Sequence, residues 1–336
     1  MRIGNYSIDL DFALKEINEN GYGKVLIQLP DGIKRYATSI ARYIEDGTDC
    51  GIVISSSSCY GACDIAIHDA KSIRADAILH LGNLPIPNLS FPIPIIFASV
   101  EMDTKMGFIE KSLKFLEGKR VGIATTAQHI NCLGDIVDIL TRNGFHPIIS
   151  KGNDRIAKKG LVLGCNFTSI TSIQDKIDSV LFVGTGLFHP LGLAFAVDKP
   201  IIAVNPITGE ITKDELKVEK RKMLKRRFAV IEKAKNANSF GVLVSSKPGQ
   251  SRIGLAENIM NELKQNGKES YMMICDNIDP MQISNFSEID CIISTACPRI
   301  ALDDYCNFDI PILTPVEVEI LLGKREISDY KFDTIY

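Results

Sequence analysis

The stretch Lys24–Gly32, KVLIQLPDG, shows the pattern that runs through the whole chain. A short apolar run rich in Val, Leu and Ile stops at a Pro-Asp-Gly turn. Such a run is typical of a strand buried on both faces of a parallel sheet. The same order of strand and polar turn returns in RVGIATTAQ (Arg120–Gln128) and FGVLVSSKPGQ (Phe240–Gln250). The sequence therefore predicts a repeated α/β unit.

Two further phrases repeat in the same order. A later strand preceded by an acidic residue occurs in ADAILHLGN (75–83), IDSVLFVGTG (177–186) and IDCIISTAC (289–297). A closing strand flanked by proline occurs in FPIPIIFASVE (91–101), DKPIIAVNPIT (198–208) and FDIPILTPVEV (308–318). Helical patterns lie between the strands, and alternation of this kind predicts parallel sheets covered by helices.

We therefore predict an α/β protein of three similar small domains, each a roughly four-stranded parallel sheet flanked by helices. The predicted domains are residues 1–103, 104–207 and 208–336, and a long helix over residues 213–237 leads into the third. A single large doubly wound sheet is the alternative architecture.

Composition limits the function classes. The chain of 336 residues is 45% hydrophobic and 24% charged, with a formal net charge of −3, so it is not built as a whole to wrap nucleic acid. No apolar stretch predicts a membrane span or a signal peptide, which indicates a cytoplasmic protein. Nine cysteines in such a chain favour metal binding, redox chemistry or simple burial over disulfides.

The cysteines of SSSSCYGACD (55–64) follow an apolar run with the spacing C-x-x-x-C. A radical-SAM signature would need another cysteine at position 66, which is alanine. Each predicted domain, however, has a cysteine after one of its strands, at Cys63, Cys165 and Cys297. Ligands bind at the carboxyl ends of parallel strands, so domains around a pseudo-threefold axis would bring these thiols to one centre.

Three thiolates would leave one iron of a cubane cluster without a protein ligand, and an open metal position suits substrate binding. A zinc site and scattered core cysteines are the competing interpretations. Cys59 neighbours the predicted site. The remaining cysteines are expected to pack as small hydrophobic residues: Cys50, Cys132, Cys275, Cys291 and Cys306.

Several motifs resemble one family. YGACD (60–64), VLGCN (162–166) and ACPRIALDDY (296–305) are similar to the three cysteine motifs of the diphthamide-synthesis radical enzymes, the 2-(3-amino-3-carboxypropyl)histidine synthases. QLPDG (28–32), GLFHPLGLA (186–194) and VNPITGE (204–210) add to the match, and the length resembles the archaeal homodimeric type. Asn83 in HLGN stands where many relatives have a histidine.

The resemblance implies that Cys63, Cys165 and Cys297 bind a [4Fe–4S] cluster at the pseudo-threefold centre, and that the spacing from Cys59 is coincidence. It implies reductive cleavage of the Cγ–S bond of S-adenosylmethionine (SAM), which gives methylthioadenosine. The 3-amino-3-carboxypropyl group then adds to C2 of a histidine imidazole on translation elongation factor 2, the first step of diphthamide synthesis. Implied partners are that factor, a second copy of the chain and an external electron donor, with no sequence-specific nucleic acid.

Further site candidates lie in the loops that follow strands. Helix N-termini attract carboxylates, so one loop could hold the SAM carboxylate. The candidates for cofactor contacts are Gln28, Lys247, Gly249 and Gln250, the nucleoside-approaching glycines Gly184 and Gly186, and the side chains His189 and Arg299. Arg299 could instead pair with Asp303 or Asp304.

The basic run Lys220, Arg221, Lys222, Lys225, Arg226 and Arg227 is predicted to be a solvated helix face, or alternatively a surface that steers the elongation factor.

Two other functions stay open at this stage. One is a Lewis-acid iron–sulfur enzyme with a similar three-domain, three-cysteine plan, as in quinolinate synthesis. The other is a non-catalytic partner subunit, which the presence of all three cysteines disfavours.

Overall fold

The computed structural model describes residues 1–336, and the chain divides into two compact units. The first comprises Met1–Val162, Thr168–Gly186 and Lys199–Ile211. The second comprises Leu163–Phe167, Leu187–Asp198 and Thr212–Tyr336. The predicted domain boundaries near residues 103 and 208 stay predictions, but the segment with Cys165 groups with the last part of the chain.

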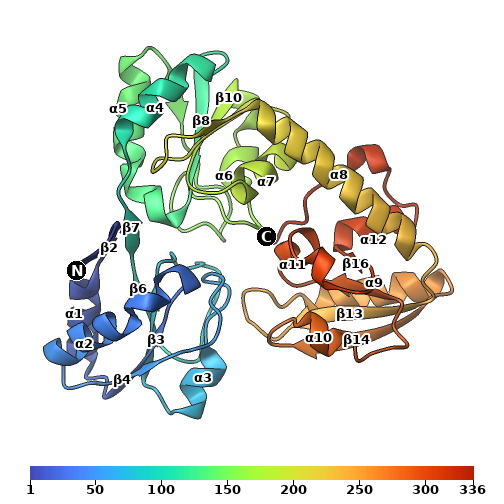
Figure 1. Ribbon diagram of the computed structural model, residues 1–336, viewed down its shortest axis with the longest axis horizontal. Coiled ribbons are helices and arrows are strands. Elements are labelled where there is room, and N and C mark those ends of the chain that lie inside the picture. Colours follow the sequence, from blue (N-terminus) through green and yellow to red (C-terminus); the bar gives the residue numbers. More distant parts are fainter. The chain divides into compact units, whose positions relative to one another are not determined.

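The first sheet, in the first unit, is parallel with the order β4-β3-β5-β6. Its strands are β3 (Lys24–Gln28), β4 (Gly51–Ile54), β5 (Ala77–Leu81) and β6 (Ile95–Ala98). Its helices are α1 (Leu10–Asn20), η1 (Asp31–Tyr36), α2 (Ala37–Gly47) and α3 (Ile67–Ser72) (Figure 1). All five residues of β5 are buried, as the continuous apolar run predicts.

A small antiparallel sheet of β1 (Arg2–Ile3), β2 (Tyr6–Ile8) and β7 (Val100–Met102) adds to the first unit. This sheet was not among the predicted elements. Its signal is a two-residue turn, Gly4–Asn5, in which Gly4 has φ +58°, a conformation that favours glycine.

The second sheet has the order β12-β11-β10-β8-β9, one strand more than expected. Its strands are β8 (Arg120–Thr125), β9 (His146–Ile148), β10 (Ser179–Val183), β11 (Ile201–Val204) and β12 (Ile211–Thr212). Its helical segments are α4 (Met106–Ser112), η2 (Leu113–Phe115), η3 (Ala127–Cys132), α5 (Leu133–Arg142), α6 (Thr168–Thr171) and η4 (Gln174–Lys176).

The third sheet, in the second unit, is parallel with the order β14-β13-β15-β16. Its strands are β13 (Ser239–Ser245), β14 (Glu269–Cys275), β15 (Cys291–Ser294) and β16 (Ile312–Leu313). The longer helices of the second unit are α7 (Phe188–Ala196), which follows β10 of the second sheet, α8 (Asp214–Ala234), α9 (Ile253–Gln265) and α12 (Pro315–Leu321). Its shorter ones are α10 (Pro280–Ile283), α11 (Pro298–Leu302), η5 (Tyr305–Asn307) and η6 (Ile327–Asp329).

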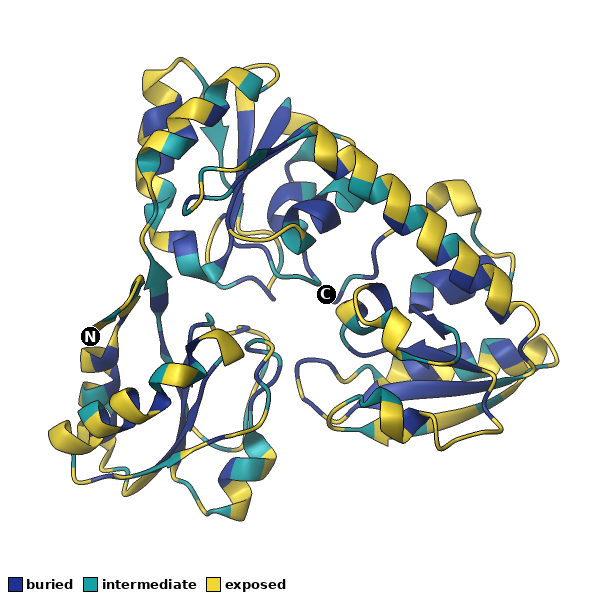
Figure 2. Ribbon diagram, in the orientation of Figure 1, coloured by how far each residue is buried: buried dark blue, intermediate teal, exposed yellow.

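The main parallel strands follow one order in all three sheets. In each, the first strand of the repeat lies between the second and third, and the fourth lies outside the third. Figure 2 shows that the central strands are largely buried while the helices expose their outer faces. The predicted α/β architecture of repeated parallel sheets is confirmed, and the strand order reverses beside the first strand, where ligands bind in such folds.

The acidic residue of the repeated phrase has a physical reason. The carboxylates of Asp76, Asp178 and Asp290 each accept two backbone N–H bonds, at 2.8–3.0 Å, from the start of the first strand of their own sheet. These bonds lower the pKa of Asp290, and the paired Arg120 guanidinium together with such bonds lowers the pKa of Asp178. The acid thus fixes the register of strands that are far apart in sequence.

Candidate functional site

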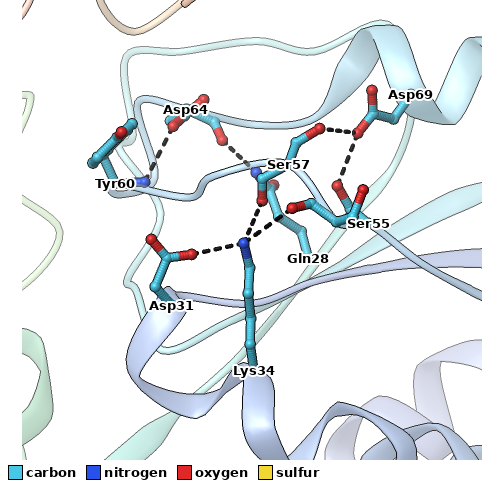
Figure 3. A network of polar contacts seen from close by, with 9 residues as sticks. Gln28, Asp31, Lys34, Ser55, Ser57, Tyr60, Asp64 and Asp69 are labelled. Atoms are coloured by element: carbon cyan, nitrogen blue, oxygen red, sulfur yellow. Dashed lines mark hydrogen bonds and ion pairs between the residues drawn. The ribbon is translucent and has the colours of Figure 1, made fainter.

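Cys63 lies in the loop between β4 and α3, and the side chain of Gln28 holds this loop. Gln28 Nε2 donates to Asp64 O at 2.6 Å, and Gln28 Oε1 accepts from Ala66 N at 3.1 Å. Asp64 closes the turn, because its carboxylate accepts from Tyr60 N (Figure 3) and its own N–H donates to Gly61 O. The backbone after Cys63 is therefore bonded to the end of the central strand β3.

The serine run before Cys63 is bonded as well. Ser55 Oγ and Ser57 Oγ both donate to Asp69 Oδ2, at 2.8 and 2.9 Å. Lys34 Nζ donates to Ser57 O at 2.8 Å and pairs with Asp31 at 2.6 Å (Figure 3). The loop with Cys63 is thus fixed at both ends by side chains from neighbouring helices and strands.

His80 lies behind this loop, fully buried in β5. Its Nδ1 is 3.0 Å from Gln28 Oε1, an acceptor, and its Nε2 is 3.1 Å from Asn83 Nδ2, a donor. His80 therefore carries its proton on Nδ1. Burial lowers the pKa of His80 to about 3, so the ring stays neutral and does not exchange a proton near neutral pH.

Cys59 and Cys63 differ in their surroundings. Cys59 is 6% exposed, and burial together with the Asp64 carboxylate raises the pKa of its thiol to about 12. Cys63 is half-buried and is not in a disulfide. Because metals and electrophiles react with the thiolate, these surroundings favour Cys63 as the ligand.

Cys165 lies in a tight turn within the second unit. Leu163 and Asn166 exchange backbone bonds at 3.0 and 3.1 Å across it. Cys165 O accepts from Ile335 N at 2.8 Å, and Asn166 Nδ2 donates to Ile335 O at 2.8 Å. The last residues of the chain therefore hold the turn with Cys165.

Cys297 lies between β15 and α11, at the N-cap of that helix. The two buried residues before it, Thr295 and Ala296, offer their carbonyls to Arg252, at 2.5 and 3.1 Å. Arg299 pairs with Asp303 at 2.7 Å, as one alternative expected, and its guanidinium lies 4.5 Å from the centre of the Phe188 ring. Cys297 is half-buried, like the other two predicted ligands.

The other candidate residues lie in the loops that follow strands, apart from His189, which lies in the first turn of α7. Gly184 directly follows β10, at a position where a Cβ would come within 2.8 Å of the Phe182 ring, and Gly186 has φ +73°. Burial, with a contribution from Arg299, lowers the pKa of His189 to about 4. Lys247 is buried with Nζ 2.8 Å from Asn277 Oδ1.

Gln250 N donates to Lys247 O at 2.9 Å, and Gly249 lies between them in the loop after β13. The predicted SAM contacts stay predictions.

The structure divides the predicted ligands between the units, with Cys63 in the first and Cys165 and Cys297 in the second. Neither unit by itself gathers three or more His, Cys, Asp or Glu side chains in a metal-binding arrangement. Sequence reasoning missed Gln28 as a support of the Cys63 loop and missed Arg252 altogether, because neither contact has a local sequence signal.

Two expectations outside the site are wrong. Cys306 is exposed, so it does not pack as a small core residue. Arg227 is fully buried, so it does not belong to a solvated basic face.

Comparison with known proteins identifies the family. The family model described as "Putative diphthamide synthesis protein" matches residues 29–332, a range that includes all three predicted cluster cysteines. The chain belongs to the diphthamide synthesis family.

Two archaeal relatives in the diphthamide synthesis family match over almost their whole length. The chain is 36% identical to 2-(3-amino-3-carboxypropyl)histidine synthase from Pyrococcus horikoshii, over 96% of this chain and 92% of that protein. It is 31% identical to the enzyme of that name from Methanocaldococcus jannaschii, over 98% of this chain and 93% of that protein.

The crystal structure of Dph2 from Pyrococcus horikoshii with a 4Fe-4S cluster is similar in fold. Its TM-score is 0.89 at 35% identity, over 98% of this chain and 94% of that one. This agreement at the level of the whole chain supports the α/β fold derived above. No helix of the chain is long and apolar enough to cross a bilayer.

Proposed function

We propose that this protein is a 2-(3-amino-3-carboxypropyl)histidine synthase. It would transfer the 3-amino-3-carboxypropyl group of SAM to C2 of a histidine imidazole on translation elongation factor 2, with methylthioadenosine as the other product. The observation that carries the proposal is the match to the Pyrococcus horikoshii synthase, which covers nearly all of both chains. The cytoplasm, where translation takes place, is the expected location.

The donor set fits an iron–sulfur cluster. Cys63, Cys165 and Cys297 are half-buried and outside any disulfide, and each lies in a loop that is hydrogen-bonded to residues distant in sequence. Thiolates are the usual protein ligands of such clusters. When bound, a [4Fe–4S] cluster held by three cysteines supplies one electron and an iron with an open position for SAM.

Other residues of the chain hold the cysteine loops in position or are candidates for contact with SAM. Gln28 holds the Cys63 loop, and Arg252 holds the backbone before Cys297. His80 stays neutral, so it orients Gln28 and does not act as an acid or base. Lys247, Gly249, Gln250 and Arg299 are the residues to test as contacts of the SAM carboxylate, together with Gly184 and Gly186 near the nucleoside.

The partners implied by the family resemblance belong to this proposal. They are elongation factor 2 as the protein substrate, a second copy of the chain in a homodimer, and an external electron donor.

Iron and sulfide content after anaerobic purification tests the ligand set. We expect about four irons per chain, and a large loss of iron in Cys63→Ala, Cys165→Ala and Cys297→Ala. Cys59→Ala is the matched control and should keep its iron, because its buried thiol has a pKa near 12. Loss of iron in Cys59→Ala alone would contradict the assignment.

Product analysis then tests the reaction. The reduced protein, mixed with SAM and elongation factor 2, should release methylthioadenosine and add mass to the target histidine. A full cluster that leaves SAM intact with a reductant present would favour Lewis-acid chemistry instead.

A further inference from the structure

The last residues of the chain contact the loops of both predicted ligands in the second unit. Ile335 bonds through its N–H to Cys165 O and through its carbonyl to Asn166 Nδ2, both at 2.8 Å. The first bond joins backbone to backbone, and the second comes from the side chain of Asn166. The side chain of Ile335 is buried, so the tail is packed as well as bonded.

Two residues upstream, Asp333 bonds to the support of the other ligand. Its carboxylate pairs with both terminal nitrogens of Arg252, at 2.9 and 2.6 Å. The two side chains are 5% and 13% exposed. Arg252 also donates to Thr295 O and Ala296 O, the two carbonyls before Cys297. One guanidinium thus joins the tail to the Cys297 loop.

The two carbonyls need such a donor. They belong to fully buried residues that lie beyond the end of β15, where the strand ladder no longer supplies a partner. Buried carbonyls are almost always hydrogen-bonded, and an unmet one is costly. Because Arg252 meets both, the position of the backbone before Cys297 depends on where Asp333 holds the guanidinium.

Aromatic packing anchors the tail at Phe332, one residue before Asp333. The Phe332 ring lies 5.8 Å from the Phe167 ring, just past the Cys165 turn, and 5.7 Å from the Phe188 ring. Phe332 is buried, so the tail cannot shift without moving these neighbours.

We propose that residues 332–335 form a strap that sets the positions of Cys165 and Cys297 relative to each other, with Arg252 and Asp333 as positioning residues. As a statement about cluster binding, this rests on the proposed function. Residues that orient metal ligands commonly change metal affinity by an order of magnitude or more, and a rigid cubane demands fixed thiolates.

The first test uses the protein without a cluster. Arg252→Met removes the guanidinium that supports the Cys297 loop. We expect about tenfold faster alkylation of Cys165 and faster hydrogen exchange of residues 163–167, because the change is transmitted through Asp333 and the tail. The readout is peptide-level mass spectrometry.

Arg325→Met is the matched control. Its guanidinium pairs with Glu319 and Asp329 in the same unit and bonds to neither cysteine loop. It should leave Cys165 alkylation unchanged. Unchanged Cys165 reactivity in Arg252→Met, or an equal change in both variants, would overturn the strap.

The second test uses the protein with its cluster. Asp333→Asn keeps the side-chain shape but removes its charge, so it weakens the pairing with the Arg252 guanidinium. Below its unfolding temperature, the variant should lose iron to a chelator about tenfold faster than the wild type and show an altered electron paramagnetic resonance spectrum when reduced. A wild-type spectrum together with wild-type iron retention would contradict the proposal that the strap positions the cysteines for cluster binding.

The two tests separate the two proposals. If the wild-type protein holds no iron, the proposed function fails, while the alkylation and exchange results still decide whether the tail links the two loops.

Discussion

At the scale of single residues, the side chain of Gln28 connects the backbone after Cys63 to the central strands β3 and β5. Its two amide atoms bond to Asp64 O, Ala66 N and His80 Nδ1. All of these contacts join β3 to segments that follow much later in sequence. A glutamine at a strand end is a candidate ligand contact from sequence alone, and only the tertiary structure reveals it as a support for a loop.

We predict that Gln28→Leu loosens the Cys63 loop and lowers the free energy of unfolding. The variant leaves Asp64 O, Ala66 N and His80 Nδ1 without their Gln28 partner. Each lost hydrogen bond should cost about 1–3 kcal/mol of the free energy of unfolding. Urea unfolding and the rate of Cys63 alkylation without the cluster measure the two effects.

Gln128→Leu is the control. The side-chain amide of Gln128 donates one hydrogen bond, to Gly82 O, away from the Cys63 loop. A Cys63 alkylation rate equal to that of wild type in Gln28→Leu would contradict the role.

At the scale of elements, helix α8 presents two kinds of basic side chain. Lys222, Lys225 and Arg226 are exposed, as the predicted solvated face requires. Arg227 points the other way and pairs with Glu317 of α12, with both side chains nearly unexposed and N–O distances of 2.7 Å. It also donates to Ala301 O and Ile312 O.

We predict opposite outcomes for charge reversal on the two faces of α8. Arg227→Glu places a second carboxylate beside buried Glu317 and should cost at least about 3–5 kcal/mol, enough to unfold the second unit. Lys222→Glu, Lys225→Glu and Arg226→Glu together should leave the unfolding temperature nearly unchanged.

Thermal unfolding followed by circular dichroism distinguishes these outcomes. Of the two, only the exposed-face variant is suitable for testing elongation factor binding. A stable Arg227→Glu protein would show that the buried pair contributes little.

At the scale of the whole molecule, the fold buries neutral histidines. His80 and His129 are at most 2% exposed, and burial lowers their pKa values to about 3 and about 4. In the unfolded chain both would titrate near 6.5. Below pH 6.5 the two histidines take up protons in the unfolded state but stay neutral in the folded state. Their contribution to the free energy of unfolding is therefore fully present above pH 6.5 and falls as the pH drops.

We predict a loss of stability between pH 7 and pH 5, a range in which most carboxylates stay ionised. Each of the two histidines should contribute about 2 kcal/mol of that loss by pH 5. Urea midpoints across this range measure it, and His129→Gln should show a shallower decline. A flat midpoint from pH 7 to pH 5 would contradict the burial of neutral rings.

What the sequence by itself determined is the repeated architecture. Apolar runs long enough for a buried strand, turns that follow them and an acid before the third strand recur three times, because each repeat must satisfy the same backbone bonds. Local periodicity carries this information, so the strands and the long helix were predictable. The cysteine motifs likewise pointed to the family before the fold was known.

Only the tertiary structure decided which side chains support those cysteines. Gln28 contacts the Cys63 loop, Arg227 meets Glu317 and Asp333 meets Arg252 across long stretches of sequence. A polar side chain has the same sequence signature whether it faces water or a buried partner. Its role is set by which groups burial leaves in need of a hydrogen bond, and that depends on the packing of the whole unit.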